Sequence, residues 1–406
     1  MSAMRKNVNG QMRRLLAALC TGAAVFAVLL CACSIRPSET EADTASVPEI
    51  AVTATPVPTP APTPEPTPEP TPPPVEVTLT GSGPEEILGL MDVENLVYVD
   101  ASASTCYAEL MQLRQAKPEC IIDYFVDLGG VTVGSRDESA DIQGVRISVP
   151  ELKEKLQYLP ELKSLDMCSL GYTNEQSLEI VEAYPDIDIT WTVKFAKWSV
   201  RSDIQSFSTL QDIGMEHRYT TTELAPLFEY CTELRALDLG HNYITDLEPI
   251  RNLKKLQALI IGDSLIKDIS PLGDLTELRY LEMFLGYNVE DFTPLNNLTK
   301  MIDINVCFCS KLTNLDFLEY MPDLKTCWSI STGLTREQTE QIKEKYPDVQ
   351  FLFYGTTSVN DGWRATDRNV AVRKAFVNWR NVVAFNSWDD VEYVEGVYII
   401  DTKPIY

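Results

Sequence analysis

The chain has 406 residues but only two histidines, His217 and His241, so few of its side chains could support acid–base catalysis. A nucleophile–histidine–acid site would have to use one of these two. His241 stands in a Gly-His-Asn sequence between an expected strand and its turn, where an exposed turn residue is the simplest interpretation. The glycines at 81–83 and 129–130 have the character of turns or linkers and not of a phosphate-binding loop.

One pair of carboxylates has a spacing that glycoside hydrolysis could use. Asp238 and Glu282 occupy equivalent places in segments that we expect to lie two strands apart, which separates them by roughly 9–10 Å in a parallel sheet. That separation is near the upper limit for an inverting glycosidase. An open concave sheet, however, offers no pocket that would raise the pKa of one acid, and acidic residues are abundant throughout the chain. We therefore expect no enzyme activity and no cofactor.

The ten cysteines do not predict a metal site, because the chain contains no CxxC pair and too few histidines. Outside the amino-terminal segment their number is odd and their spacing irregular, which does not indicate a disulfide framework. Most of these fall in strand-like segments, where we expect buried free thiols. A helix over 104–117 would hold Cys106 and Cys120 roughly 20 Å apart, too far for a disulfide. The seven are Cys106, Cys120, Cys168, Cys231, Cys307, Cys309 and Cys327.

The amino terminus has the pattern of a secretory signal. Four basic residues precede an apolar run over 15–32, and no acidic residue occurs before Glu39. Leu30-Cys31-Ala32-Cys33 resembles the lipobox of bacterial lipoproteins, which implies cleavage after residue 32 and lipidation of Cys33. Cys31 departs from the small residue that is usual at that place. The alternative is a membrane-spanning signal anchor, since the run is close to the lower limit of roughly 17 residues for a span.

A proline-rich tract follows the signal. Residues 48–74 contain 12 of the 25 prolines, and such a tract adopts extended polyproline II, which at about 3.1 Å per residue would reach roughly 80 Å. We expect residues 1–32 to be a signal peptide and residues 33–80 a disordered stalk. The stalk would hold the folded part away from a membrane.

The charge of the chain excludes some partners. Four of its 34 basic residues precede Cys33, so the remaining part carries 30 basic against 59 acidic residues. Nucleic acid binding depends on clustered Lys and Arg, and we expect no nucleic acid partner. The excess of acid favours solubility and allows a basic or neutral ligand.

Internal repeats are the strongest signal in the sequence. Apolar segments begin at Leu234, Leu256, Leu278, Met301 and Leu324, a spacing of 22, 22, 23 and 23 residues. Each starts with alternating apolar residues, typical of a short strand, and continues with apolar residues at every third position, which suits a 3₁₀-like return. No single turn of this length can bury its apolar face, so the turns must stack.

Two details of the repeat predict local structure. Asn242 follows the first strand, where a buried Asn can bond the backbone of neighbouring turns. An Asp precedes a Pro by three residues in three successive units, which is favourable at a tight helical start. These pairs are Asp246/Pro249, Asp268/Pro271 and Asp291/Pro294.

A longer unit occurs twice, at 160–187 and 322–349, with many identical residues at a constant offset of 162. Thr173 and Thr335 stand where an N-cap belongs, each with a Gln three residues later, so both units predict a helix with a capping box that ends before a Tyr-Pro pair. A weaker copy over 96–122 predicts strand, helix and strand.

These repeats resemble the leucine-rich repeat family, in particular its internalin-like and SDS22-like branch. The longer units, the VRSD sequence at 200–203 and the GWR…RKAF pattern at 362–376 resemble exported leucine-rich repeat lipoproteins of clostridia, which are Gram-positive. The resemblance implies a curved α/β solenoid with a parallel concave sheet and a 3₁₀- or α-helical convex side. We expect longer, irregular repeats at 81–233, regular repeats at 234–349 and a capping segment at 350–406. Ser264 departs from the Asn column, which is irregular around 286–310.

The alternation of side chains places a row of residues on the concave face. With Leu237, Leu259 and Leu281 inside, the residues beside them should face solvent, and aromatic side chains there would suit a binding surface. The alternative is that the terminal segment 355–406 folds over these aromatics, or that some of them point inward. The predicted ligand-binding residues are Asp238, Ile260, Tyr280, Glu282, Phe284, Asn305 and Trp328, with Asp166 and Phe308 in equivalent or neighbouring places.

These observations favour a lipid-anchored protein on the outer face of the cell membrane that binds a protein or glycan. Such a protein would be adhesin-like or associated with the cell envelope. A solute-capture lipoprotein of a transport system is the alternative, but it would need two lobes about a cleft.

The anchor can be tested directly. A clickable fatty acid fed to cells should label the wild-type chain and leave Cys33→Ala unlabelled, because only the Cys33 thiol would be acylated. Equal labelling of the two proteins would contradict the prediction.

Overall fold

The computed structural model describes residues 72–209, 217–357, 361–363, 366, 369 and 372. The chain divides into two units at Pro70/Thr71, and all described residues belong to the second. The expected signal peptide, Cys33 and residues 33–71 of the stalk lie outside them. Among the described residues, no helix combines the length and the apolar character that crossing a membrane requires.

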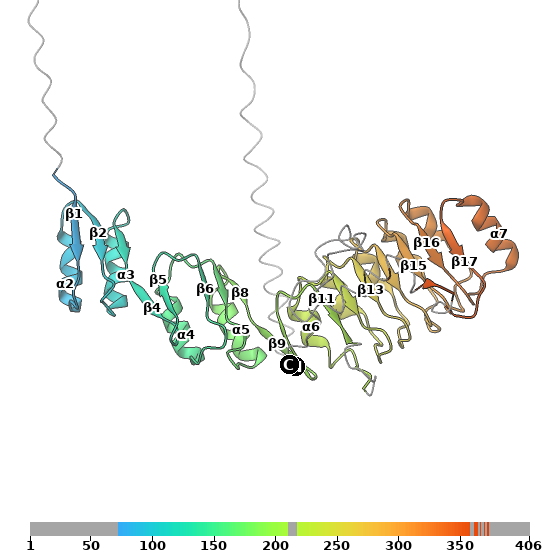
Figure 1. Ribbon diagram of the computed structural model, residues 1–406, viewed down its shortest axis with the longest axis horizontal. Coiled ribbons are helices and arrows are strands. Elements are labelled where there is room, and N and C mark those ends of the chain that lie inside the picture. The colour runs from blue at the N-terminus through green and yellow to red at the C-terminus, as the bar shows by residue number, and fades with distance from the viewer. Residues whose placement is uncertain are drawn as a thin grey trace, which may run out of the picture. The chain divides into compact units, whose positions relative to one another are not determined.

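The regular repeats form one parallel sheet of seven strands in chain order, which Figure 1 shows side by side. Each strand is three residues long and pairs in register with the next, so that Leu237 lies beside Leu259 and Leu259 beside Leu281. The strands are β11 (Ser206–Ser208), β12 (Ala236–Asp238), β13 (Ala258–Ile260), β14 (Tyr280–Glu282), β15 (Asp303–Asn305), β16 (Thr326–Trp328) and β17 (Gln350–Leu352).

A short 3₁₀ helix returns the chain after each of four strands, as predicted. The Asp before each Pro accepts a backbone N–H two residues on: Glu248 donates to Asp246 at 2.8 Å, and Ser270 and Thr293 do the same in the next two turns. This satisfies a donor that the helix start would leave unpaired. The helices are η3 (Glu248–Asn252), η4 (Ser270–Asp274), η5 (Thr293–Asn297) and η6 (Asp316–Tyr320).

One apolar core runs through the stack. Its buried residues extend from Leu79 to Phe353, and every turn of the regular region contributes to it. Leu237, Leu259 and Leu281 in neighbouring strands are all fully buried there. Since each turn covers only the next, burial in this core holds the turns together.

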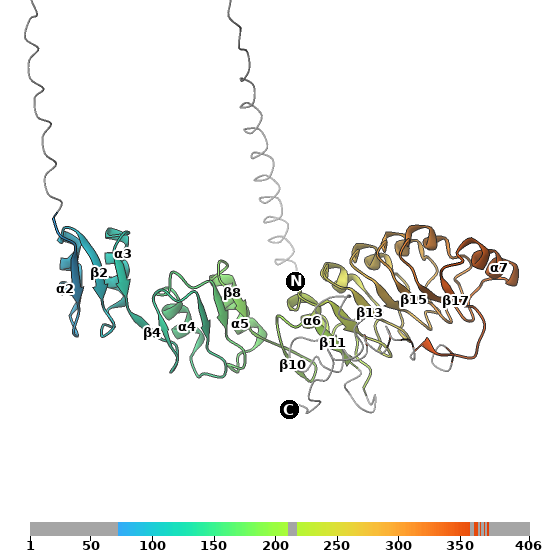
Figure 2. The same cartoon turned by 45° about the horizontal axis from the view of Figure 1, so that its top comes forward.

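The preceding part contains two smaller parallel sheets with helices beside them (Figure 2). The first consists of β1 (Val75–Thr78), β2 (Leu96–Asp100) and β3 (Ile121–Asp123), with α2 (Pro84–Gly89), η1 (Leu90–Asp92) and α3 (Tyr107–Ala116). The second consists of β6 (Ser139–Asp141), β7 (Ser164–Asp166) and β8 (Asp188–Thr190), with α4 (Val149–Leu156) and α5 (Asn174–Ala183). α6 (Ala225–Tyr230) follows β11, and α7 (Arg336–Lys345) precedes β17.

The predictions for the longer units are confirmed. α5 and α7 both begin with a complete capping box, at Thr173 and Thr335, and both end at the Tyr that precedes Pro. The weaker copy forms the expected strand, helix and strand in β2, α3 and β3.

Two β-hairpins, which the sequence did not predict, lie between the three parallel sheets in chain order. They are β4 (Phe125–Asp127) with β5 (Thr132–Gly134), and β9 (Thr192–Phe195) with β10 (Trp198–Arg201). Asp166 consequently lies in the second small sheet and not in the row of the seven-stranded sheet, where we expected it.

The same two hydrogen bonds close both hairpins. Ser135 donates its N–H to Tyr124 O and accepts the N–H of Tyr124 on Oγ, and Ser202 makes the same pair with Trp191. Both aromatic side chains are buried. Each hairpin therefore begins beside a core aromatic residue that directly follows the last strand of a small sheet.

Two predicted boundaries need correction. The stalk cannot extend to residue 80, because Val75–Thr78 pairs with β2 and Leu79 is buried in the core. The regular sheet does not end at 349, because β17 pairs with β16 as its last strand. In both cases backbone pairing between strands extends the folded region beyond the limit that the sequence suggested.

Asn242 plays the expected role. Its Nδ2 donates to Leu239 O at 3.0 Å and Gly240 O at 3.1 Å, and its Oδ1 accepts the N–H of Tyr219 at 2.8 Å. Ser264 is too short to do the same in the next turn. Its buried Oγ has no hydrogen-bond partner among the described residues, and a void of about 10 Å³ lies beside it.

Replacing Ser264 by Asn should restore the column. The longer amide can reach the carbonyls of Ile261 and Gly262, just as Asn242 bonds the carbonyls of Leu239 and Gly240 one turn earlier. Ser264→Asn should therefore raise the free energy of unfolding by roughly 0.5–1.5 kcal/mol. Urea unfolding followed by circular dichroism measures this difference. A decrease in the free energy of unfolding would show that the void cannot admit the amide.

Candidate functional site

The structure brings the predicted row together. Asp238 pairs with Ile260, Ile260 with Glu282, Glu282 with Asn305, and Asn305 with Trp328 across consecutive strands. Tyr280 lies two residues before Glu282 on the same strand and on the same face. The prediction that these residues share one face of the sheet is confirmed.

The expectation that this row faces solvent is wrong. Asp238, Ile260, Tyr280, Glu282, Asn305 and Trp328 are each at most 3% exposed, and Phe284 and Phe308 are half-buried. Many of the apolar residues here belong to a second cluster that is separate from the core of the stack. The cluster includes Trp363 and Val372. Described residues of the terminal segment therefore cover this face, which was the alternative interpretation.

Asn369 joins the terminal segment to the centre of the row. Its Nδ2 lies 2.5 Å from Tyr280 Oη and 3.2 Å from Glu282 Oε1, and Tyr280 Oη also donates to Glu282 Oε1. All three side chains are buried. Glu282 is thus a buried carboxylate that accepts hydrogen bonds from a phenol and an amide.

Aromatic contacts complete this closure. Trp363 meets Trp328 edge to face at 5.4 Å between ring centroids and Tyr280 at 5.6 Å. Three buried N–H donors here have no hydrogen-bond partner among the described residues: Trp328 Nε1, Trp363 Nε1 and Asn305 Nδ2. Each such atom costs roughly 1–3 kcal/mol.

The Asp238–Glu282 pair does not form an open carboxylate site. Ile260 lies between the two residues in register, and Asp238 accepts hydrogen bonds from Ser208 Oγ at 3.1 Å and from the N–H of Gly240 at 3.0 Å. Among the described residues no group of three His, Cys, Asp or Glu side chains could hold a metal ion.

An exposed apolar column lies just beyond the strand ends and was missed at the sequence level. Tyr243, Leu265 and Tyr287 are 47, 47 and 50% exposed. Each is the tenth residue of its repeat and follows the paired residues of β12, β13 and β14 by the same distance along the chain. Neighbouring strands lie about 4.8 Å apart, and we call these three equivalent residues the strand-end ridge. The identical position in three repeats was the signal.

Left-handed turns hold the ridge in place. The eighth residue of each repeat has a positive φ without being glycine, and for four of them the backbone N–H bonds the following turn; His241, for example, donates to Gly262 O at 2.8 Å. This conformation is uncommon outside glycine. It turns the chain two residues before the ridge position. The residues are His241, Asp263, Leu285, Phe308 and Ser331.

Polar groups flank one end of the ridge. Asp263 lies 2.9 Å from His241 Nδ1 and 3.4 Å from an Arg218 nitrogen, and the Arg218 guanidinium lies 5.6 Å from the centre of the Tyr243 ring. His241 is therefore a turn residue, as expected, but it is only partly exposed and bonds its neighbour.

A hollow of about 580 Å³ lies between η5 and η6, lined by Glu290, Asp291, Asp316 and Glu319 among others. Lys311 pairs with Glu290 at 2.5 Å within it. The hollow is an acidic depression between two turns of one stack and not a cleft between two lobes, which the solute-capture alternative would need.

The family model described as "Leucine Rich repeats (2 copies)" matches residues 232–274, which contain the first two regular turns. The matched residues include strands β12 and β13 and helices η3 and η4. The regular region is a leucine-rich repeat solenoid.

Solved structures of leucine-rich repeat proteins are similar to this chain. Internalin C2 of Listeria monocytogenes has 20% identity over 54% of this chain and 80% of its own, with a TM-score of 0.29. A leucine-rich repeat protein of Leptospira interrogans has 14% identity over 66% and 74%, with a TM-score of 0.31. Both scores lie below 0.5, so the assignment depends on the family model and the repeat geometry. No curated protein matches the chain.

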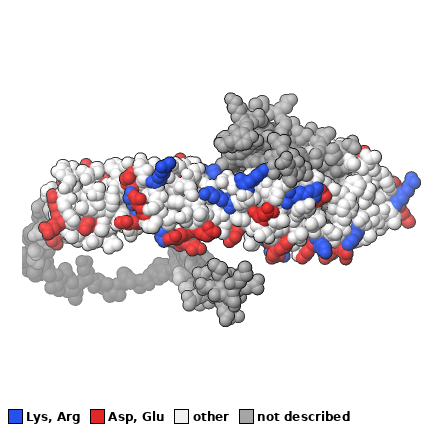
Figure 3. All heavy atoms as spheres, turned by 90° about the horizontal axis from the view of Figure 1, so that it is seen from below, with Lys and Arg blue, Asp and Glu red and all other residues white. Residues whose placement is uncertain are grey.

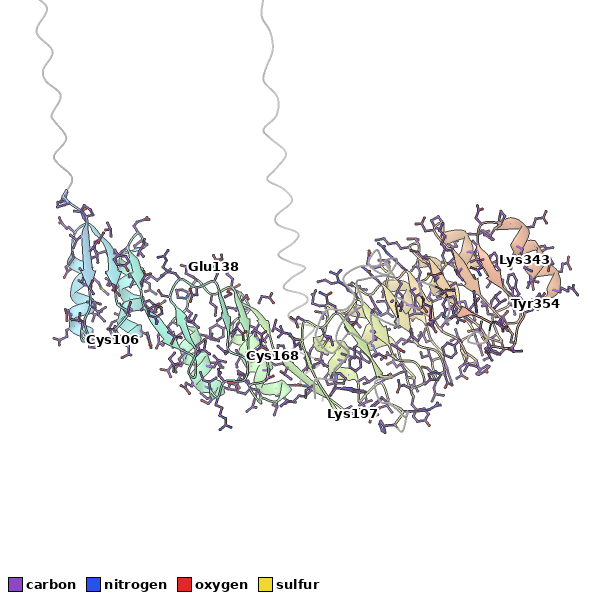
Figure 4. All side chains as sticks on the ribbon, in the orientation of Figure 1. Cys106, Glu138, Cys168, Lys197, Lys343 and Tyr354 are labelled. Carbon is purple, nitrogen blue, oxygen red and sulfur yellow. The ribbon has the colours of Figure 1, made fainter. Side chains whose placement is uncertain are left out.

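Surface charges of the leucine-rich repeats pair between turns. Lys255 bonds Glu233 at 2.5 Å and Lys300 bonds Glu277 at 2.6 Å, and Figure 3 shows Lys and Arg among Asp and Glu on one face. Lys343 lies 6.0 Å from the Tyr354 ring at the last turn, where Figure 4 labels both. Exposed pairs of this kind add little stability.

All seven described cysteines are free thiols, and six are buried. Cys106 is the N-cap of α3 and Cys120 follows its other end. Burial raises the pKa of the Cys168, Cys307 and Cys309 thiols from 9.0 to about 12. These thiols therefore stay neutral in the folded state at physiological pH.

The raised pKa values predict a loss of stability in alkali. The unfolded thiols ionise near pH 9 and the folded ones near 12, so in that window the unfolded state binds fewer protons and unfolding becomes more favourable as pH rises. The stabilising effect is complete below pH 9. Cys309→Ala should reduce the slope of the free energy of unfolding against pH by up to about 1.4 kcal/mol per pH unit. Urea unfolding of both proteins from pH 8 to 11 measures it, and parallel curves would contradict the account.

Proposed function

We propose that this chain is a lipid-anchored, cell-surface binding protein that recognises a protein partner through the strand-end ridge of its leucine-rich repeats. The observation that carries the proposal is the ridge itself: Tyr243, Leu265 and Tyr287 are each about half exposed at one position of three successive turns.

The ridge is unusual for a merely solvated surface. Single exposed apolar residues are common and need no explanation. Three at the same position of successive repeats are different, because together they expose a larger apolar area. Tyr and Leu expose large apolar area with little rotamer entropy to lose, and Arg218 and Asp263 supply a polar rim.

The predicted lipid anchor is consistent with the same function. A lipid on Cys33 and the proline-rich stalk would present the repeats outside the membrane, within reach of other surface proteins. The row from Asp238 to Trp328, with Tyr280 and Phe284, stays a predicted ligand face, but its burial favours the ridge as the surface that a partner meets first. A glycan ligand would use the same tyrosines and is an outcome of the test.

Site-specific photocrosslinking in cells tests the proposal. Benzoylphenylalanine at position 243, 265 or 287 of the full chain should give a discrete protein adduct on irradiation, because the side chain would lie inside the interface. Tyr320 is the matched control, since it is 48% exposed but lies on η6, away from the ridge.

Adducts of the same mass and yield from position 320 would mean nonspecific contact. No adduct from any ridge position, together with an adduct from position 320, would move the binding surface to the helical side. Loss of an adduct after treatment with glycosidases would identify a glycan instead.

A further inference from the structure

Two separate apolar clusters lie on the two faces of the seven-stranded sheet. Leu237, Leu259 and Leu281 point into the core of the stack, whereas Ile260, Tyr280 and Trp328 belong to the second cluster. The core requires only residues of the repeats and the small sheets. The second cluster is completed by Trp363 and Val372, which come from the chain beyond the last strand.

Local hydrogen bonds link described residues between Thr356 and Asn369, in the chain beyond the last strand. Asp361 accepts the N–H groups of Thr356 at 2.7 Å and Thr357 at 3.1 Å, and Gly362 takes a φ of +99° that few other residues adopt. Thr366 then donates to Trp363 O at 2.9 Å and accepts the N–H of Asn369 at 3.3 Å. The spacing of three residues lets the segment present several side chains to the sheet together.

Three side chains of this segment are buried against the concave face. Trp363, Asn369 and Val372 are 1, 1 and 0% exposed. Trp363 packs on Trp328 and Tyr280, and Asn369 bonds Tyr280 and Glu282. The contacts described for these three residues reach the concave face and not the leucines of the core.

The fit leaves hydrogen-bond donors unused. Trp328 Nε1, Trp363 Nε1 and Asn305 Nδ2 are all N–H groups, and all are buried without an acceptor among the described residues. Two of these donors belong to the sheet, so an occupant with well-placed acceptors would fit it better than the present one does. Backbone carbonyls of an extended peptide are acceptors of this kind.

We propose that Trp363, Asn369 and Val372 form an intramolecular clasp that closes the concave face, and that an extended peptide with an aromatic anchor displaces it. The clasp holds the face shut until a peptide supplies both the ring that fills the place of Trp363 and carbonyl oxygens for Asn305 and Trp328. This regulation does not depend on the strand-end ridge, which lies beyond the strand ends and stays exposed.

The test uses the full chain with a labelled synthetic peptide of residues 361–372. Wild type holds its own clasp and should bind the peptide weakly, whereas Trp363→Ala opens the face and should bind it at least ten-fold more tightly by fluorescence anisotropy. A peptide carrying the Trp363→Ala change should bind neither protein. Asn369→Ala, which removes only the bonds to Tyr280 and Glu282, should have a smaller effect in the same direction.

Thermal unfolding separates a clasp from a structural cap. Trp363→Ala should keep a midpoint close to that of wild type, while Leu259→Ala, which leaves a cavity in the core of the stack, should lower the midpoint without creating peptide binding. Unfolding of Trp363→Ala at the temperature of Leu259→Ala would overturn the proposal, because Trp363 would then be part of the core. Equal peptide binding by wild type and Trp363→Ala, or binding by neither, would also overturn it.

Discussion

Register between parallel strands is the constraint on which the rest of this structure depends. A turn of 22 residues offers three strand residues and a short 3₁₀ helix, too little to enclose an apolar core, so it is stable only when its leucines lie beside those of the next turn. Leu237, Leu259, Leu281, Ile304 and Cys327 do so in consecutive strands. The helix starts, the buried Asn242 and the left-handed turns all serve to return the chain to that register.

Because the register is fixed, the alternation of side chains divides each strand between two tasks. One set of residues holds the stack together. The other set forms a face that any binding protein could use, and in this chain that face is buried beneath residues that include Trp363 and Val372. The left-handed turn at the eighth residue then exposes the tenth, which explains how a repeat built for burial also presents Tyr243, Leu265 and Tyr287 to solvent.

The sequence predicted what depends on local spacing. The leucine period located the strands, the Asp before each Pro located the 3₁₀ helices, and the Thr and Gln of both capping boxes located α5 and α7. It did not predict the two hairpins, because their short strands have no periodicity that distinguishes them from a further turn. It placed Asp238, Glu282 and Trp328 on one face but did not predict that this face is covered. The covering residues Trp363 and Val372 are about 35 to 135 positions away in the chain, and no repeat relates them to the face.

Hydroxyl-radical footprinting of the full chain tests most directly the claim that the aromatic residues of the repeats divide into a covered set and an exposed set. The account predicts rapid modification of Tyr243 and Tyr287 and slow modification of Tyr280, Trp328 and Trp363, measured peptide by peptide by mass spectrometry in the native state. Rapid modification of Tyr280 and Trp328 would show an open concave face, and slow modification of Tyr243 and Tyr287 would show that the ridge is itself covered; either result would contradict the account.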